Sequence, residues 1–232
     1  MRVWKLSLAA TAASLALGGS AMAQDDMTPS FSFNVGANSD YVFRGVSQTD
    51  EDPQVFGGAD VSAGSFYAGV WASNVDFLDS TDAEVDVYAG VKPTLGAVTA
   101  DLGVIYYGYV NSPSGSDYAY WEFKAAGSVA AGPATVGLAA YYSPDFFGAV
   151  DEALYYEVNA AMPLGESKFS VSGALGRQEL EGPGDYTTWN LGVGYAVTDN
   201  LGLDLRYWDT ADAGSFGPYY EPRVTIGVKA TF

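Results

Sequence analysis

The segment RVTIGVKATF, from Arg223 to Phe232, alternates between apolar and polar or small residues. Because successive side chains of a β-strand point to opposite faces, this pattern predicts a strand with one apolar face. The apolar phase holds Val224, Ile226, Val228, Ala230 and Phe232. The strand therefore ends on an aromatic residue on its apolar side, and the fold must explain what covers that side.

The same alternation recurs along the chain in segments of about ten residues, the length of a tilted membrane-spanning strand. After Ala23 we find no convincing amphipathic helix. In the third segment, FYAGVWASNV, aromatic residues occupy both phases, which indicates a bulge. The twelve predicted strands span 31–43, 54–63, 66–75, 83–92, 98–109, 118–129, 134–142, 153–162, 168–176, 186–197, 201–208 and 223–232.

The connections between these strands alternate between tight links and longer segments. Gly64-Ser65 is a tight link, for example, whereas residues 44–53 and 76–82 form longer ones. Tight turns at one end of a sheet and longer loops at the other are typical of bacterial outer-membrane barrels, with the short turns on the periplasmic side. An even number of strands also brings both ends of the sheet to that side.

Alternation alone would also fit a soluble β-sandwich, which hides one face of each strand. All charged residues in the predicted strands lie in the phase opposite to the apolar residues, and that phase is rich in Gly, Ala and Ser. Small residues mixed with charges of both signs favour a confined lumen over an open surface. Since every backbone polar group must be paired in hydrocarbon, such a sheet has to close on itself.

We therefore predict an all-β fold, a transmembrane antiparallel up-and-down β-barrel of twelve strands with short periplasmic turns and longer external loops. The residues predicted to line its pore are Glu84, Asp86, Asp101, Glu122, Lys124, Glu157, Lys168, Asp204, Arg206, Arg223 and Lys229.

The first residues, MRVWKLSLAATAASLALGGSAMA, show the pattern of a secretory signal peptide. A basic start precedes a short apolar run and an Ala-Met-Ala cleavage site. We expect a cleaved signal over 1–23, a short periplasmic leader over 24–30 and the barrel domain over 31–232. This organisation is typical of a protein exported to the outer membrane of a Gram-negative bacterium.

The residues after Ala23 carry eight Lys and Arg against 28 Asp and Glu, a net charge of −20. Nucleic acid is excluded as a partner because phosphate binding needs clusters of Lys and Arg. Most of the acids fall in the longer connections, which predicts an acidic external rim that concentrates cations above the lumen. The rim residues are Asp50, Glu51, Asp52, Asp76, Asp79 and Asp82. Oxygen ligands in such loops can also hold Ca²⁺, although neither cluster matches a known coordination pattern.

A family resemblance covers residues 33–109. The stretches NVGANSDYVFRGVSQT, GGADVS, FYAGVWASNVDF and EVDVYAGV resemble the TorF family of porin-like proteins. The motif Ser39-Asp40-Tyr41, Phe43-Arg44-Gly45 and Ser47-Gln48 is the most specific part. The resemblance implies an outer-membrane barrel with a channel role and leaves the solute open.

An enzymatic function is not expected. The chain has no His and no Cys, so the usual general base at neutral pH and the thiol nucleophile are missing. Glu84 and Asp86 share a phase and could in principle act as a carboxylate pair, but wall residues are the simpler interpretation. No cofactor is expected.

The sequence thus predicts a porin-like outer-membrane channel for passive diffusion of small solutes or ions, with weak cation preference. The alternative is a closed barrel with a structural or surface-interaction role, because inward aromatic residues can fill the lumen. Those residues are Tyr67, Tyr88, Tyr107, Tyr118, Tyr120, Tyr141, Tyr155 and Trp208.

Expected partners are outer-membrane lipid and lipopolysaccharide, small solutes or cations, and the outer-membrane assembly machinery, which would read the last strand ending at Phe232. Aromatic residues near strand ends are typical of the girdles at the two membrane interfaces. The predicted girdle residues are Phe31, Tyr41, Phe43, Trp121, Tyr142, Trp189, Tyr195 and Tyr207.

Overall fold

The protein is described here by a computed structural model, which defines residues 27–148, 150–211 and 217–232. The predicted signal peptide and the first residues of the predicted leader lie outside these ranges. Two short strands and one short edge strand accompany the long ones. The strands are β1 (Ser30–Asn38), β2 (Val42–Phe43), β3 (Val46–Ser47), β4 (Gln54–Ala63), β5 (Phe66–Asn74), β6 (Ala83–Val91), β7 (Thr94–Leu95), β8 (Val98–Val110), β9 (Tyr120–Ala131), β10 (Ala134–Ser143), β11 (Ala153–Pro163), β12 (Phe169–Leu180), β13 (Tyr186–Ala196), β14 (Leu201–Ala211) and β15 (Arg223–Thr231).

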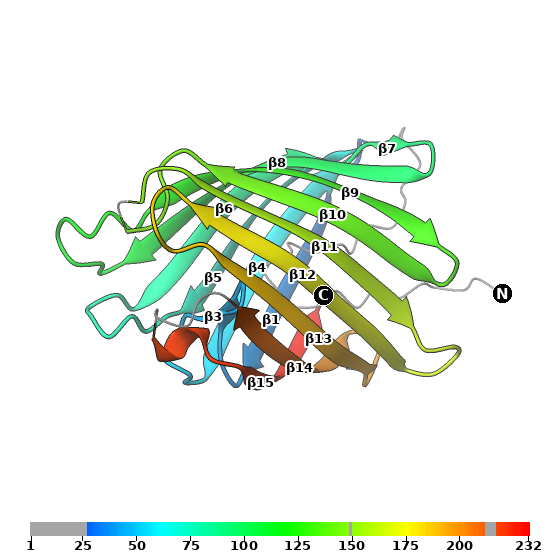
Figure 1. The fold of residues 1–232 in the computed structure, drawn as a ribbon. Coiled ribbons are helices and arrows are strands. Elements are labelled where there is room, and N and C mark those ends of the chain that lie inside the picture. Colours follow the sequence, from blue (N-terminus) through cyan, green and yellow to red (C-terminus); the bar gives the residue numbers. More distant parts are fainter. Residues whose placement is uncertain (1–26, 149, 212–216) are drawn as a thin grey trace.

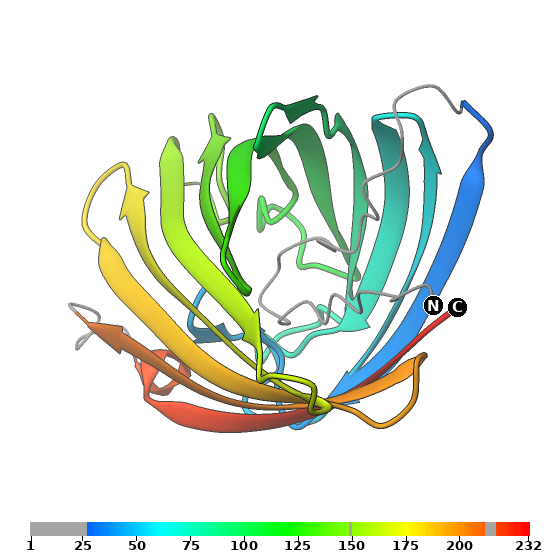
Figure 2. The same ribbon diagram turned by 90° about the vertical axis from the view of Figure 1, so that its right-hand side faces the viewer.

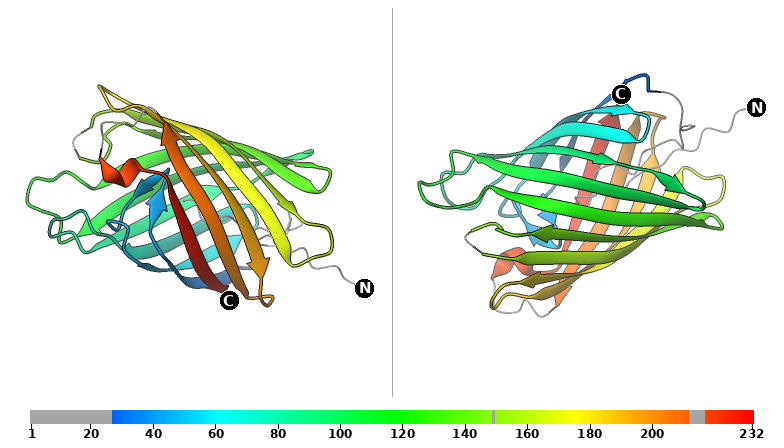
Figure 3. Two further views of the ribbon diagram at one scale, coloured as in Figure 1. Left: turned by 60° about the horizontal axis from the view of Figure 1, so that its bottom comes forward. Right: turned by 90° about the horizontal axis from the view of Figure 1, so that it is seen from above.

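The twelve long strands form one closed antiparallel barrel, as predicted. Each pairs with its neighbour in sequence, and β1 closes the ring by pairing with β15, as in Asn34 opposite Thr231. Phe232 extends this closure, because its N–H and C=O exchange hydrogen bonds with Phe33 at 2.9 and 3.0 Å. Figure 2 shows the ring of strands from one end, and Figure 3 shows their tilt. No helix within the described ranges is long and apolar enough to cross a membrane.

The connections differ between the two ends of the barrel (Figure 1). Short hairpins such as Gly64-Ser65 and Gly132-Pro133 lie at the end that we call periplasmic. Residues 39–53, 75–82, 111–119, and 144–148 with 150–152, belong to connections at the opposite, external end, where the short 3-10 helix η1 (Pro218–Tyr220) also lies. The fifth external connection is shorter than predicted because β12 continues to Leu180, which leaves residues 181–185 as the loop.

The outer wall is apolar, and the interior carries the charges. Exposed aliphatic and aromatic side chains such as Leu138, Val158 and Leu191 point outward from the strands, whereas Glu84, Asp101 and Arg206 are buried inside. Water would be a poor solvent for a continuous apolar wall of this kind, and hydrocarbon a good one. Phe232 is 69% exposed and lies on the outer side, as predicted.

The third predicted strand, β5, has no bulge. It pairs residue by residue with β4 from Phe66 to Ser73 and with β6 over its whole length. Tyr67 and Trp71 point inward and Phe66 and Val70 outward, so aromatic residues occupy both phases because both faces of this strand accommodate rings.

Small residues on the inner wall make room for large ones on the neighbouring strand. The Tyr88 ring covers Gly69 and the Tyr155 ring covers Gly176, so an added Cβ atom would meet ring carbons at 2.5–2.8 Å in both places. The abundance of inward glycine therefore reflects a packed interior, because each large side chain needs a partner without a side chain.

The first strand is shorter than predicted, and this is the main correction to the predicted fold. It ends at Asn38, and the chain then leaves the wall and turns into the barrel. Tyr41 and Phe43 were predicted to lie in the aromatic girdle, which is wrong: Tyr41 is buried in the interior and Phe43 packs against the interior aromatic cluster. Trp121, Tyr142 and Trp189 do lie on the outer wall near strand ends.

Candidate functional site

The first external connection folds into the barrel as a β-hairpin made of β2 and β3. Val42 pairs with Ser47 and Phe43 with Val46, so the turn consists of Arg44 and Gly45. Their φ angles are 48° and 86°, both positive, as a two-residue type I′ turn requires. Glycine adopts this conformation freely, whereas at Arg44 it carries strain that the surrounding contacts must offset.

The Arg44 guanidinium reaches the far wall of the barrel. It forms a two-point ion pair with Glu122 of β9, with Nη1–Oε1 and Nη2–Oε2 distances of 2.7 and 2.8 Å, and donates a 3.2 Å hydrogen bond to Gln178 of β12. It also lies 4.4 Å from the centroid of the Tyr155 ring and 4.9 Å from that of Tyr141. One side chain at the hairpin tip thus contacts β9, β10, β11 and β12.

Both carboxylate oxygens of Glu122 have hydrogen-bond donors in this arrangement. Its side chain is 1% exposed, and that of Arg44 is 6% exposed. Tyr107 donates a further hydrogen bond of 2.9 Å to Glu122 Oε2. Such a buried two-point pair is geometrically specific, because the planar guanidinium matches the carboxylate.

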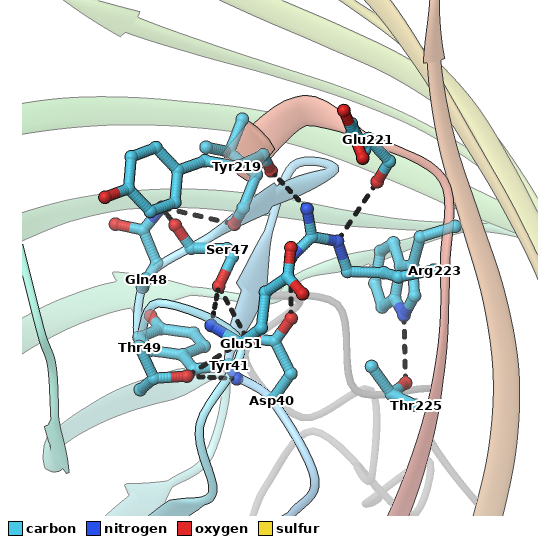
Figure 4. A network of polar contacts seen from close by, with 12 residues as sticks. Asp40, Tyr41, Ser47, Gln48, Thr49, Glu51, Tyr219, Glu221, Arg223 and Thr225 are labelled. Atoms are coloured by element: carbon cyan, nitrogen blue, oxygen red, sulfur yellow. Dashed lines mark hydrogen bonds and ion pairs between the residues drawn. The ribbon is translucent and has the colours of Figure 1, made fainter. Parts of the chain in front are cut away.

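The base of the hairpin is held by a second polar network (Figure 4). Arg223 of β15 donates a 2.8 Å hydrogen bond to Asp40 and also bonds the carbonyl oxygens of Pro218, Tyr219 and Glu221. Asp40 accepts hydrogen bonds from Ser47 and Thr49, at 2.7 and 3.0 Å. The network joins the hairpin, η1 and the last strand into one unit at the external rim.

The opposite side of the hairpin base contacts β6. Tyr41 donates a 2.7 Å hydrogen bond to Glu84, and both side chains are buried. Around the hairpin, Tyr88, Ile105, Tyr107, Tyr120, Tyr141 and Tyr155 form a buried cluster against which Phe43, Trp71 and Tyr109 pack. The interior of the barrel is therefore narrowed at the level of the hairpin, and the inserted loop forms its constriction.

The predicted pore-lining residues fall into several groups in the structure. Asp101 accepts from Lys124 and Tyr67, both at 2.8 Å, and Lys92 lies 3.6 Å away. Arg206 pairs with Asp204 and donates to Asn190. Glu157 accepts from Tyr155 and Asn159, and Lys229 is half-buried on the inner wall.

Two of the predicted pore-lining residues lie near the ends of the barrel instead of along its wall. Arg223 is part of the network at the hairpin base. Lys168 lies in the turn before β12, is exposed and donates a 2.9 Å hydrogen bond to the carbonyl oxygen of Val197. Of the aromatic residues predicted to fill the lumen, Tyr118 instead lies in an external loop, where it is half-buried and stacks on Phe147 at 4.4 Å.

The predicted acidic rim residues lie in the external connections. Glu51, Asp52, Asp76, Asp79 and Asp82 are exposed, and Asp50 is half-buried. Hydrogen bonds from Thr81 and Tyr118 lower the pKa of the Asp79 carboxyl, so its charge persists to lower pH than that of an ordinary aspartate. Within the described ranges, no group of three or more acidic residues is arranged to hold a metal ion together, so the rim has no ready-made Ca²⁺ site there.

Arg44 was not among the predicted pore-lining residues, although its side chain is buried inside the barrel. One signal for its role was available: it lies at the centre of the motif on which the family resemblance depends. Gly45, the next residue of that motif, also packs tightly in the interior, because a Cβ atom there would collide with Thr188 of β13.

Residues 22–232 match the model of a family described as a bacterial protein of unknown function (Gcw_chp). The chain belongs to this family. No curated protein matches the sequence.

Members of several porin groups have similar solved structures. The KdgM porin matches with a TM-score of 0.60 at 11% identity, covering 87% of this chain and 99% of that one. The NanC porin matches with a TM-score of 0.57 at 12% identity (88% and 99% covered), and the COG4313 outer membrane channel from Pseudomonas putida F1 with 0.53 at 11% identity (87% and 95% covered). At these identities the likeness concerns the fold. It agrees with the apolar outer wall, which is that of a membrane-spanning β-barrel.

Proposed function

We propose that this barrel is a porin-like outer-membrane channel for passive diffusion of small solutes or ions, with a weak preference for cations. The supporting observation is the charged interior: carboxylates and bases of the wall are buried inside a barrel whose outside is apolar. Burying charges is costly unless they are paired or hydrated, and a lumen that admits water meets that need. The resemblance to TorF porin-like proteins supports the same function.

The proposed cation preference has two sources. The external rim carries more acids than bases, which raises the local cation concentration at low ionic strength. Inside, several bases are neutralised by direct pairing, as in Lys124 with Asp101 and Arg44 with Glu122. Bases that are paired in this way offer little attraction to anions, so the remaining carboxylates determine the sign of the field.

A second candidate function is a closed barrel with a structural or surface-interaction role. The inserted hairpin favours it, because Arg44 and the surrounding tyrosines fill the interior at the external half. The two functions differ in what the hairpin does. In a channel it moves out of the lumen or leaves room for ions beside it, and in a closed barrel it does neither. We do not propose a catalytic role or a cofactor.

We propose that the partners of the barrel are outer-membrane lipid and lipopolysaccharide around the apolar wall, small solutes or cations in the lumen, and the outer-membrane assembly machinery at the last strand. The exposed Phe232 on the outer side supports the third of these. A substitution of Phe232 by Ser would be expected to reduce the yield of assembled barrel in cells.

Planar-bilayer recordings test the function directly. A channel is expected to give discrete conductance steps, and under a tenfold KCl gradient a reversal potential of the sign that reports cation preference. Clear anion preference would contradict the proposed selectivity. Absence of conductance steps from refolded barrel, together with no uptake of small sugars in liposome swelling, would support the closed barrel.

A further inference from the structure

One buried carboxylate in the interior lacks the partners that its neighbours have. Asp86 of β6 is 8% exposed, and its Oδ1 atom has no hydrogen-bond donor among the described residues. Every other acid on the inner wall strands has a donor: Asp60 from Tyr88, Glu84 from Tyr41, Asp101 from Lys124, Glu122 from Arg44, Glu157 from Asn159 and Asp204 from Arg206. A buried carboxylate oxygen without a donor is costly, and in native proteins it is explained by a bound water or ion.

The surroundings of Asp86 are negative. Glu84 precedes it by two residues on the same inner face, and Glu122 is close enough to Asp86 for their charges to interact. Arg44 is engaged in two-point pairing with Glu122. A water molecule at Asp86 would satisfy the oxygen atom, but only a proton or a cation would also neutralise the carboxylates of Asp86 and Glu84.

The strand pairing also places aromatic residues beside Asp86. Trp71 of β5 lies opposite it on one side and Tyr107 of β8 on the other, and both rings belong to the interior cluster. Aromatic ring faces attract cations, most strongly where water is excluded. A cation next to Asp86 would thus bind a carboxylate on a wall that also carries two aromatic residues at the same level.

We propose that Asp86 forms a binding site for a single monovalent alkali cation inside the lumen. A multidentate divalent site does not fit, because no three acidic residues in the described ranges are arranged to share one ion. A single carboxylate with aromatic neighbours suits a weakly held ion of unit charge. The proposal deepens the proposed cation preference and rests on it, since the site would be a resting place for cations that enter from the acidic rim.

The site can be tested without relying on conduction. Purified full-length barrel in detergent is unfolded by heat in NaCl, in KCl and in N-methylglucamine chloride at equal ionic strength, so that general screening is the same. A ligand that binds the folded state raises the unfolding midpoint with its concentration. We expect a higher midpoint in Na⁺ or K⁺ than in N-methylglucamine, and we expect Asp86→Asn to abolish this difference.

Glu157→Gln is the matched control, because Glu157 is an inward carboxylate that already has donors from Tyr155 and Asn159. In Glu157→Gln the unfolding midpoint should still be higher in Na⁺ or K⁺ than in N-methylglucamine, even if all its midpoints differ from those of the wild type. A wild-type midpoint that is the same in all three salts, or a difference that survives in Asp86→Asn, would overturn the site. If bilayers show no conduction but the difference between salts is present and depends on Asp86, the channel function fails and the site stands. If bilayers show conduction with cation preference but the midpoint is the same in all three salts, the channel function stands and the site fails.

Discussion

Arg44 and Glu122 are 78 residues apart in the sequence and meet in the barrel interior, with both side chains almost fully buried. Replacing such a pair by apolar residues often leaves stability unchanged, whereas removing one partner is strongly destabilising. The pair therefore matters most for position: it determines where the first external loop rests. With its tip held on the far wall, that loop spans the lumen and constricts it.

Arg44→Ala should open the constriction and destabilise the barrel. Glu122 would lose its ion pair, and we expect the free energy of unfolding to fall by about 3–5 kcal/mol. The loop would no longer be anchored on the far wall, so single-channel conductance should rise. Urea unfolding in detergent and planar-bilayer recordings measure the two effects.

Arg177→Ala is the control for this variant. Arg177 pairs with Asp185 at 3.4 Å near the external end, and both side chains are partly exposed, at 31% and 40%. Exposed ion pairs contribute about 0–1 kcal/mol, so this variant should resemble the wild type in stability and conductance. Equal behaviour of the two variants would show that the Arg44 pair does not hold the loop.

Gly45→Ala should dislodge the hairpin tip without removing a charge. The residue has a φ of 86°, and a methyl group would collide with Thr188 and Thr210 on β13 and β14. Trypsin cleaves after arginine, and Arg44 is buried in the wild type, so we expect cleavage at Arg44 only in the variant. Gel analysis with mass spectrometry of the fragments identifies the site.

Gly96→Ala separates backbone strain from the collision. Gly96 also has a positive φ, of 65°, but a Cβ atom there would meet nothing within 4 Å. It should carry the conformational cost alone, about 1–2 kcal/mol, and should leave Arg44 protected. Cleavage at Arg44 in the Gly96 variant would mean that general destabilisation, and not the lost fit of the tip, exposes the loop.

The strands of the barrel could be predicted well because one physical rule governs all of them. The outer and inner faces of the barrel meet different surroundings, and the alternation of apolar and polar residues along each strand reflects that difference directly. Leu138 and Val158 point outward as their phase predicts, and Glu122 and Arg206 point inward. Strand ends shifted by a few residues where the pattern fades, as at Leu180.

The inserted hairpin could not be predicted by the same rule. Tyr41 and Phe43 continue the apolar phase of β1, so periodicity extends the strand through them. What turns the chain inward are contacts with distant residues: Asp40 with Arg223, 183 positions away, and Arg44 with Glu122. Local patterns carry no information on such pairs. The sequence pattern likewise cannot show that Asp86 lacks a hydrogen-bond donor, because this depends on the residues that other strands place around it.

The acidic rim should control selectivity at low salt. Neutralising Asp50, Glu51 and Asp52 together, to Asn, Gln and Asn, should shift the reversal potential toward that of a non-selective pore. The shift should shrink at 1 M salt, where the Debye length is about 3 Å. Neutralising Glu166 and Asp199 in the periplasmic turns is the control. The same shift from these two would contradict a role of the external rim.

Acidification should reproduce the effect of neutralising the rim. Ordinary aspartates bind protons near pH 4, so their attraction for cations fades as the pH falls through that value. Asp79 has a lowered pKa, so it should keep its charge to a lower pH than an ordinary aspartate does. Asp79→Asn should therefore reduce the cation preference that remains near pH 3.5, measured as the reversal potential. No difference from the wild type at that pH would contradict the persistence of the Asp79 charge.

The assignment of the outer wall to lipid can be tested with two leucines of equal exposure. Leu138, at the middle of β10, is 66% exposed, and Leu78, in the second external connection, is 67% exposed. If both faced water, Leu→Arg would have similar small effects at the two sites. Because Leu138 faces hydrocarbon near the middle of the wall, Leu138→Arg should lower the free energy of unfolding by about 2–4 kcal/mol, and Leu78→Arg by well under 1 kcal/mol. Urea unfolding in phospholipid vesicles measures both. Equal losses would mean that the apolar wall does not lie in a bilayer, and the assignment to a membrane would fail with it.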